Sequence, residues 1–190
     1  MRLALITFFA AGFFSLTTGA QSPSPEMPAT NLFDFESESE ARWQVVNDGV
    51  MGGRSRGYVA VEDGALRFTG VLVTRGGGFT SIRTRASADL GGFDGIELLV
   101  RGSGRTFELE VSDGTRWRGR AVSRRASFPT SSEWQWVRVP FSSLQASVFG
   151  RPVNPSPIDP AGIRGFGLYI ADGIDGAFGL EVDSIRAYRD

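Results

Sequence analysis

The sequence predicts an all-β fold, either a sandwich or a barrel of about eight to ten short strands. Two observations lead to this prediction. Apolar and polar residues alternate with a period of two in several segments, and glycine or proline stands in nearly every gap between them. The chain has 190 residues, 41% of them hydrophobic and 15 of them phenylalanine, which is ample material for the core of one domain.

Individual strands are expected where the alternation or a run of β-branched and aromatic residues is clearest. In chain order these segments are 66–68, 96–100, 106–111, 137–139, 166–170 and 178–187. Helix is expected only as short connectors. Ser142 to Gln145 has the form of a capping box, and Asp159-Pro160 combines an N-cap residue with proline at the first helical position.

The first twenty residues have the layout of a secretory signal peptide. Arg2 is followed by an apolar run from Leu3 to Leu16 and by small residues up to Ala20, and the run is shorter than a membrane-spanning helix. We therefore expect a signal peptide at 1–20, a Pro/Ser-rich spacer at 21–31 and a single β-sandwich domain at 32–190. This predicts an exported protein, periplasmic or extracellular, with no membrane span after cleavage. The alternative is an uncleaved anchor.

The composition excludes many catalytic mechanisms, because histidine, cysteine and lysine are all absent and every basic residue is arginine. Catalytic triads, Cys-His pairs, lysine Schiff bases and His or Cys zinc sites are therefore ruled out. We predict a non-enzymatic protein with no cofactor and no metal, and hydrolysis by two carboxylates is the one catalytic alternative left open. The formal net charge of -1 gives no reason to expect nucleic-acid binding.

The densest local motif runs from Trp43 to Ser55 and holds three glycines within five residues. Asn47, Asp48, Arg54 and Ser55 within it are candidate binding residues, since such a loop surrounds an approaching group with polar side chains. The alternative is turn chemistry alone, with Asp48 paired locally to Arg54. The segment from Asp172 to Asp175 is interpreted first as a turn and only second as a cation site.

Three further segments contribute candidate residues. A glycine loop at 76–78 leads into a strand that contains Arg83. The segment 101–105, which ends in Arg105, resembles a hairpin turn flanked by two positive charges, and the alternative to a binding role for them is a solvated turn. In 134–139 the period-two pattern places Trp134 and Trp136 on one face and the two valines on the other, so the tryptophans form either a stacking surface for a sugar ring or a second packed layer.

Taken in order, these motifs resemble the complex I intermediate-associated protein 30 family. The resemblance covers residues 32 to 188, and the Asp-Gly-Val-Met-Gly-Gly-x-Ser stretch from Asp48 to Ser55 is its most specific part. The other matching segments are 66–70, 77–83, 101–105, 136–141, 163–168 and 176–185. The resemblance implies a galactose-binding-like jelly-roll β-sandwich with short helical connectors. It also implies a non-enzymatic role, because the mitochondrial members act as assembly factors that hold intermediates of respiratory complex I.

Two functions follow as hypotheses. The first is a domain that binds a partner protein, with a scaffold or assembly role. The second is an exported carbohydrate-binding module, in which Asp48 or an arginine bonds to hydroxyls while a tryptophan stacks on the ring. The residues predicted to bind are Asn47, Asp48, Arg54, Ser55, Arg83, Arg105 and Trp136.

Overall fold

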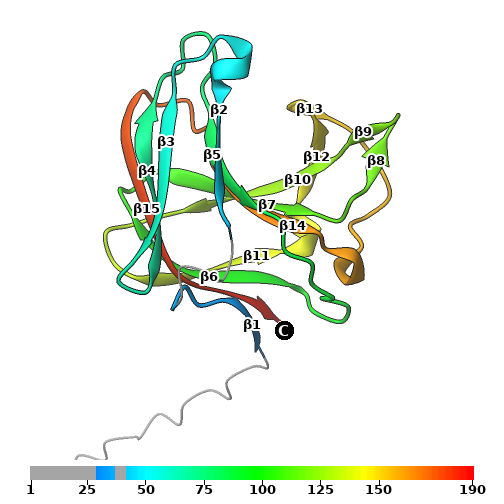
Figure 1. Ribbon diagram of the computed structural model, residues 1–190. Coiled ribbons are helices and arrows are strands. Elements are labelled where there is room, and N and C mark those ends of the chain that lie inside the picture. Colours follow the sequence, from blue (N-terminus) through cyan, green and yellow to red (C-terminus); the bar gives the residue numbers. More distant parts are fainter. Residues whose placement is uncertain (1–28, 37–41) are drawn as a thin grey trace, which may run out of the picture.

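The computed structural model describes residues 29–36 and 42–190, and almost all regular structure in this part of the chain is β-strand (Figure 1). The strands form two antiparallel sheets, which we call sheet I and sheet II, and one separate short hairpin. The predicted all-β sandwich is therefore confirmed.

Sheet I is built around the long C-terminal strand. In sheet order its strands are β11 (Gln135–Pro140), β6 (Gly95–Gly102), β15 (Gly176–Tyr188), β4 (Ala65–Leu72) and β3 (Arg56–Glu62), and β1 (Ala29–Phe33) pairs with the last residues of β15. One edge of β15 pairs with β6, and the other edge pairs with β4 and then with β1. The first described strand is therefore bound directly to the last one.

Sheet II contributes the second layer and has strands from the whole length of the domain. In sheet order they are β13 (Arg151–Pro152), β12 (Gln145–Val148), β10 (Ser123–Pro129), β7 (Thr106–Ser112), β14 (Gly165–Ile170), β5 (Thr80–Thr84) and β2 (Gln44–Asn47). The separate hairpin consists of β8 (Arg116–Trp117) and β9 (Arg120–Ala121).

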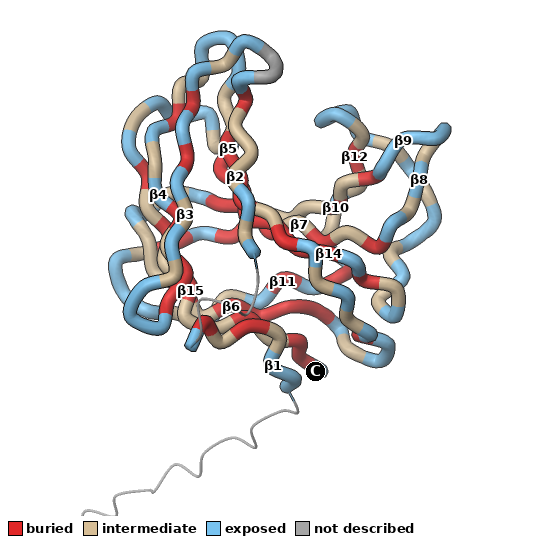
Figure 2. The backbone as a smooth tube through the Cα atoms, viewed as in Figure 1, coloured by how far each residue is buried: buried red, intermediate tan, exposed pale blue. Residues whose placement is uncertain are grey.

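The core lies between the two sheets, and buried residues recur along the strands of both sheets, as the red stretches in Figure 2 show. On β7 the inward residues Phe107, Leu109 and Val111 are fully buried, as the alternation at 106–111 predicts. Phe107 meets Phe68 from sheet I at a ring-centroid distance of 6.4 Å, and Phe178 lies 5.0 Å from Phe68 and 6.2 Å from Phe107. Such edge-to-face pairs each add about 0.5–1.5 kcal/mol beyond the burial of apolar area.

Short helical connectors are confirmed at Asp159-Pro160 and next to Ser142, but the second begins at Phe141 without the predicted capping box, and the turn at Asp48 was not predicted. All three are single 3-10 turns. They are η1 (Asp48–Met51), η2 (Phe141–Ser143) and η3 (Pro160–Gly162). At η3 the side chain of Asp159 accepts a hydrogen bond from the N–H of Ala161, as expected for an N-cap residue. None of these described helices has the length and apolarity needed to cross a lipid bilayer.

The segment 101–105 is not a hairpin turn, and this corrects the prediction. The strand before it, β6, belongs to sheet I, whereas β7 after it belongs to sheet II, so the segment carries the chain from one layer to the other. Local turn residues mark the change of direction but do not show which sheet the next strand joins.

At the N-terminal end, the predicted signal peptide at 1–20 lies outside the described residues. Ala29 to Asn31, which the sequence analysis assigned to the spacer, pair with the end of β15 as part of β1. A strand can pair through its backbone without an apolar pattern of its own. The polar residues of β1 therefore gave no sequence pattern that indicates a strand.

Candidate functional site

The carboxylate of Asp48 connects the two glycine-rich loops of the sequence. Asp48 is fully buried in η1, and its oxygens accept four hydrogen bonds. The donors are the N–H of Ser55 (3.0 Å), the hydroxyl of Ser55 (2.7 Å), the N–H of Gly78 (2.7 Å) and the N–H of Phe79 (3.4 Å). Burial by itself raises the pKa of Asp48, but these hydrogen bonds outweigh it and hold the pKa below its ordinary value.

Two of the glycines around Asp48, Gly53 and Gly77, are explained by lack of space. A Cβ atom added to Gly53 would lie 2.0 Å from the Cγ of Asp48, and one added to Gly77 would lie 2.3 Å from its Oδ2. Both distances are far below van der Waals contact, so only glycine fits at either position. The most family-specific stretch of the sequence is therefore the part that packs a backbone loop directly around a buried carboxylate.

Asn47 joins the two sheets at the same end of the sandwich. Its side-chain oxygen accepts hydrogen bonds from the N–H of Gly57 (3.0 Å) in β3 of sheet I and from the hydroxyl of Thr80 (2.6 Å) in β5 of sheet II. The Ser55 hydroxyl also donates a hydrogen bond to the carbonyl of Val73 and accepts one from its N–H. Asn47, Asp48 and Ser55 thus hold the loops and sheet edges together, and the expected Asp48–Arg54 pair is replaced by bonds to Ser55. Arg54 itself is exposed.

Arg105 lies in a buried ion pair with Asp172, so the alternative of a solvated turn does not hold for this charge. The two side chains are only 9% and 7% exposed, and two guanidinium nitrogens donate to the two carboxylate oxygens at 2.5 and 2.8 Å. Hydrogen bonding from Arg105 is the main reason why the pKa of Asp172 is lowered. Arg105 also donates to the carbonyls of Ile174, Gly176 and Ala177.

The Asp172–Asp175 segment is a turn held by protein donors. Besides the pair with Arg105, Asp175 accepts a 2.6 Å hydrogen bond from the N–H of Thr74. Among residues 29–36 and 42–190, no group of three or more acidic side chains is placed to bind a metal ion.

Trp136 lies on the outer face of sheet I, on the same side as Trp134, whereas Val137 and Val139 pack toward the core as predicted. The two indoles are 43% and 39% exposed. Each is covered in part by an arginine: Arg186 lies 3.8 Å from the Trp136 ring centroid, and Arg101 lies 4.8 Å from that of Trp134.

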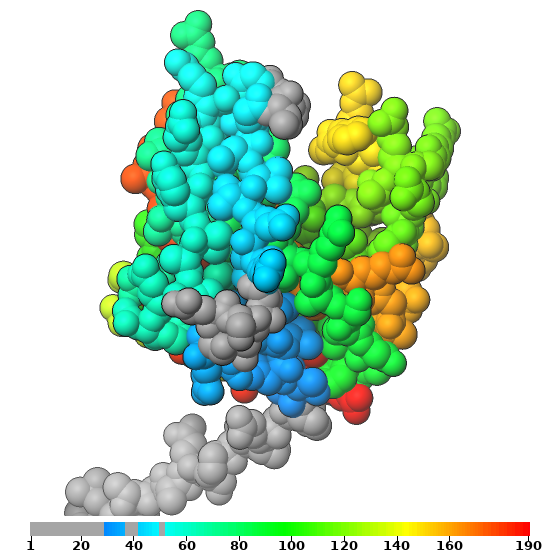
Figure 3. Space-filling model, viewed as in Figure 1, coloured from blue at the N-terminus to red at the C-terminus, as the bar shows by residue number. Residues whose placement is uncertain are grey.

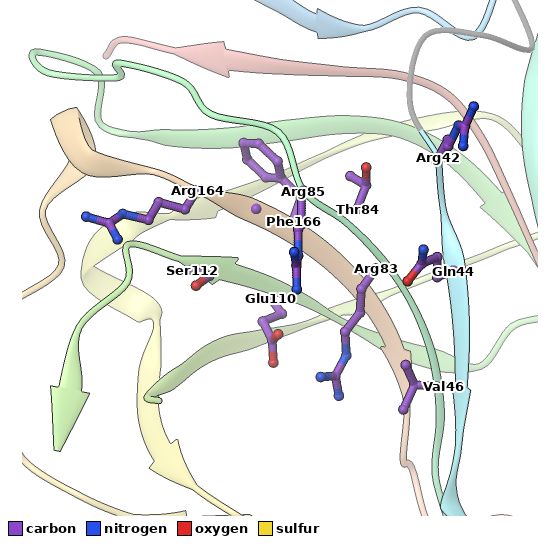
Figure 4. A pocket seen from close by; sticks show the side chains of 11 residues that line it. Arg42, Gln44, Val46, Arg83, Thr84, Arg85, Glu110, Ser112, Arg164 and Phe166 are labelled. Atoms are coloured by element: carbon purple, nitrogen blue, oxygen red, sulfur yellow. The ribbon is translucent and has the colours of Figure 1, made fainter. Parts of the chain in front are cut away.

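A large hollow lies on the side of the molecule opposite these tryptophans, on the outer face of sheet II. Figure 3 shows a deep notch between the cyan segment that contains β2 and the yellow segment that contains β12 and β13. A cleft of ≈ 970 Å³ lies beside β2 and β5, and Figure 4 shows its side chains. We call it the arginine cleft, and its lining residues are Arg42, Gln44, Val46, Arg83, Thr84, Arg85, Glu110, Ser112, Arg164, Gly165 and Phe166. A second hollow of ≈ 480 Å³, lined in part by Glu108 and Arg125, lies on the same face.

Tyr169 links the two hollows. It is only 5% exposed, and the guanidinium carbons of Arg83 and Arg125 lie 4.8 and 4.7 Å from its ring centroid. Burial, followed by the nearby carboxylate of Glu110, raises the pKa of Tyr169 well above its ordinary range. The tyrosine is therefore a neutral support for two arginines at neutral pH rather than an exposed platform.

The arginine cleft has an excess of positive charge. Four arginines line it against one carboxylate, that of Glu110, which accepts a hydrogen bond from the Ser123 hydroxyl. Arg42, Arg85 and Arg164 are exposed, and none of them makes an ion pair or hydrogen bond to another residue that the structure describes. Because these guanidinium groups remain available, the cleft can bind anionic groups.

The seven predicted residues do not form one surface. Only Arg83 lies in the arginine cleft. Asn47, Asp48 and Ser55 form hydrogen bonds within the fold, and Trp136 lies on the other sheet. Sequence reasoning missed Arg42, Arg85 and Arg164, which come from three distant parts of the chain. The one local signal was the pair Arg83 and Arg85 at a spacing of two residues, where Arg83 lies in β5 and Arg85 directly follows its last residue.

Comparison with known proteins identifies the family. The family model described as complex I intermediate-associated protein 30 matches residues 33–182. The chain belongs to this family. The buried Asp48 loop and the arginine cleft are thus features of a complex I intermediate-associated protein 30 domain, and the resemblance of the sequence motifs is confirmed.

Curated relatives carry the same name. The mouse protein "Complex I intermediate-associated protein 30, mitochondrial" is 27% identical over 182 residues, which cover 82% of this chain and 54% of that protein. The Caenorhabditis elegans protein "Probable complex I intermediate-associated protein 30, mitochondrial" is 30% identical over 103 residues, covering 52% of this chain and 30% of that protein. This chain therefore spans about half the length of the mouse relative. Because the relatives are named as mitochondrial proteins, the prediction of an exported protein is wrong.

Solved structures confirm the jelly-roll fold. The family 11 carbohydrate-binding module of the cellulase Lic26A-Cel5E from Clostridium thermocellum aligns with a TM-score of 0.65 and 16% identity, covering 87% of this chain and 96% of that module. The same family of module in complex with a mixed-linked tetrasaccharide gives a TM-score of 0.64, also at 16% identity, over 86% of this chain and 97% of that module. At this level of identity the similarity establishes the fold alone.

Proposed function

We propose that this chain is a non-catalytic binding domain that holds a partner protein during the assembly of respiratory complex I. The observation that carries the proposal is the family match over residues 33–182, together with relatives named for their association with complex I intermediates. The absence of histidine, cysteine and lysine from the sequence is consistent with a protein that binds rather than catalyses.

The arginine cleft is the surface that we assign to this partner. It has a volume of ≈ 970 Å³, and three of its arginines have no described partner within the domain. By contrast, Asn47, Asp48 and Ser55 bond to neighbouring strands and loops, so they contribute to binding through the fold that they stabilise.

Affinity capture tests this proposal. The tagged full-length chain is expressed in its source cells and recovered from detergent-solubilised membranes, and bound proteins are identified by mass spectrometry. We expect complex I subunits to be enriched with the wild type, and to be lost with the triple variant Arg42→Glu/Arg85→Glu/Arg164→Glu. The triple variant Arg56→Glu/Arg75→Glu/Arg189→Glu changes the net charge equally at exposed positions outside the cleft and serves as the control. Failure to enrich any complex I subunit would contradict the proposal.

A carbohydrate-binding module is the second candidate. It is supported by the jelly-roll fold shared with modules such as the one solved with a tetrasaccharide, and by the exposed indoles of Trp134 and Trp136. A glycan array probed with the purified chain tests it. Binding that disappears in Trp136→Ala supports this function, and an array without hits rejects it.

A further inference from the structure

We propose that the arginine cleft binds a carboxylate-rich, extended segment of the partner protein. This inference rests on the proposed function and specifies the chemistry of the partner. It starts from the three exposed arginines 42, 85 and 164, which line one cleft and have no described acidic partner. A guanidinium group offers a planar fork of N–H donors that matches a carboxylate, and each of the three forks is available.

Several other arginines of the sandwich are paired with carboxylates of the same chain. Arg105 is paired with Asp172, Arg125 with Glu108 and Arg138 with Glu97. Most arginines that the fold brings close to carboxylates are thus satisfied internally, whereas the arginine cleft holds four arginines against Glu110 alone. An acidic ligand is the partner that balances this excess of positive charge.

The size and shape of the hollow favour a chain segment over a small anion. Its volume of ≈ 970 Å³ lies at the upper end of the range for small-molecule sites, which is about 300–1,000 Å³. The second hollow of ≈ 480 Å³ lies on the same face beyond Tyr169, whose ring carries Arg83 on the side of the first hollow and Arg125 on the side of the second. A segment that crosses both hollows meets basic groups along its length.

The lining of the cleft disfavours a neutral sugar. Stacking on a sugar ring requires an exposed aromatic face. The aromatic residues that the structure places in or beneath the cleft are Phe166 and Tyr169, which are only 3% and 5% exposed. The exposed tryptophans 134 and 136 lie on sheet I, on the opposite side of the sandwich. A glycan platform and the arginine cleft are therefore separate surfaces.

The test measures binding of fluorescein-labelled peptides to the purified full-length chain by fluorescence anisotropy. The probes are an alternating Glu-Gly peptide, its Gln-Gly and Lys-Gly counterparts, and polygalacturonate as a competing acidic polysaccharide. We expect the Glu-Gly peptide alone to bind, with an affinity that falls as salt is raised, because exposed charges are screened over about 10 Å at 0.1 M salt. The cleft triple variant with glutamate at 42, 85 and 164 is expected to weaken binding by about tenfold or more, since each fork lost removes a charge-assisted hydrogen bond.

The control variant Arg56→Glu/Arg75→Glu/Arg189→Glu is expected to keep the wild-type affinity within about twofold, because these exposed arginines do not line the cleft. Circular dichroism and thermal melting verify that both triple variants are folded. Equal loss of binding in the two variants, or no binding of the Glu-Gly peptide to the wild type, overturns the inference. Tighter binding of polygalacturonate than of the peptide overturns it in favour of an acidic glycan.

The two proposals fail separately. If complex I subunits are captured through the cleft but the Glu-Gly peptide does not bind, the proposed function stands and the acidic-segment inference is wrong. If the peptide binds in the cleft but no complex I subunit is captured, the cleft has the inferred chemistry and the proposed function is wrong.

Discussion

Replacing Asp48 with asparagine tests directly whether the buried carboxylate holds the two loops together. Oδ2 accepts hydrogen bonds from the Ser55 hydroxyl and from the N–H groups of Gly78 and Phe79, and Oδ1 accepts one from the N–H of Ser55. An asparagine keeps one oxygen, which can occupy the position of Oδ2. Its amide nitrogen then faces the N–H of Ser55, and because both groups are donors this hydrogen bond is lost. The other three hydrogen bonds are made to a neutral oxygen instead of a charged one.

A hydrogen bond to a charged group contributes about 1.5–3 kcal/mol and a neutral one about 0.5–1.5 kcal/mol. One lost bond and three weakened bonds lead us to expect that Asp48→Asn lowers the free energy of unfolding by about 3 kcal/mol. For a domain of this size, that corresponds to a decrease in Tm of about 6–12 °C. Urea unfolding and thermal melting, both followed by tryptophan fluorescence, measure these changes.

Asp63→Asn is the matched control, because it makes the same chemical change at a side chain that is 85% exposed. Asp63 has a positive φ of 53°, which asparagine also tolerates. We expect this variant to lie within about 1 kcal/mol of the wild type, since it loses only an exposed ion pair with Arg67. If Asp48→Asn is no more destabilising than Asp63→Asn, the reasoning about the buried carboxylate is refuted.

The lowered pKa of Asp48 also predicts a dependence on pH. A carboxylate with a lowered pKa in the folded state contributes stability above its unfolded pKa of about 3.9, and that contribution is lost as the pH falls through the folded value. The difference in unfolding free energy between the wild type and Asp48→Asn is therefore expected to be constant near neutral pH and to shrink below about pH 4. Urea unfolding at a series of pH values measures it, and a difference that grows on acidification contradicts the assignment.

Three further substitutions test other parts of the structure. Gly53→Ala is expected to cost about 1–3 kcal/mol because its Cβ meets the Asp48 carboxylate, whereas Gly49→Ala, with no atom within 4 Å, serves as the nearly neutral control in the same urea unfolding assay. Arg105→Met leaves the buried Asp172 without its partner and is expected to lower the free energy of unfolding by about 3–5 kcal/mol. Arg67→Met, at an exposed pair, is expected to lower it by about 1 kcal/mol or less, and equal losses in the two variants contradict a buried pair. Phe107→Ala is expected to lower stability by about 3–5 kcal/mol through a cavity between the sheets, and a loss below about 1 kcal/mol contradicts its central position.

Much of the fold could be predicted from the sequence because burial on one face leaves a period-two pattern. The segment 106–111 is recognisable for this reason, whereas 166–170 was predicted from its run of aromatic and aliphatic residues and is buried throughout. Both segments form strands of sheet II. Short or polar strands such as β12 and β13 carry no such pattern, since the sheet recruits them through backbone hydrogen bonds. The correct placement of 101–105 between two sheets depends on long-range pairing, which no local residue specifies.

The candidate site was less predictable, because sequence motifs report the constraints of folding as readily as those of binding. Gly53 and Gly77 are glycines because the Asp48 carboxylate occupies the space of their missing side chains. The arginines of the cleft are spread from Arg42 to Arg164, and only folding brings them to one face of sheet II. Isolated arginines at such separations have no local pattern in an arginine-rich sequence.

The central claim is that the Asp48 loop maintains the fold while the arginine cleft binds the partner. The most direct measurement compares Asp48→Asn with the cleft triple variant for both Tm and affinity for the Glu-Gly peptide, at a temperature where both variants are folded. We predict that Asp48→Asn melts earlier but binds like the wild type, and that the cleft variant melts like the wild type but does not bind. Loss of binding in Asp48→Asn at an unchanged Tm, with binding retained in the cleft variant, would contradict the claim.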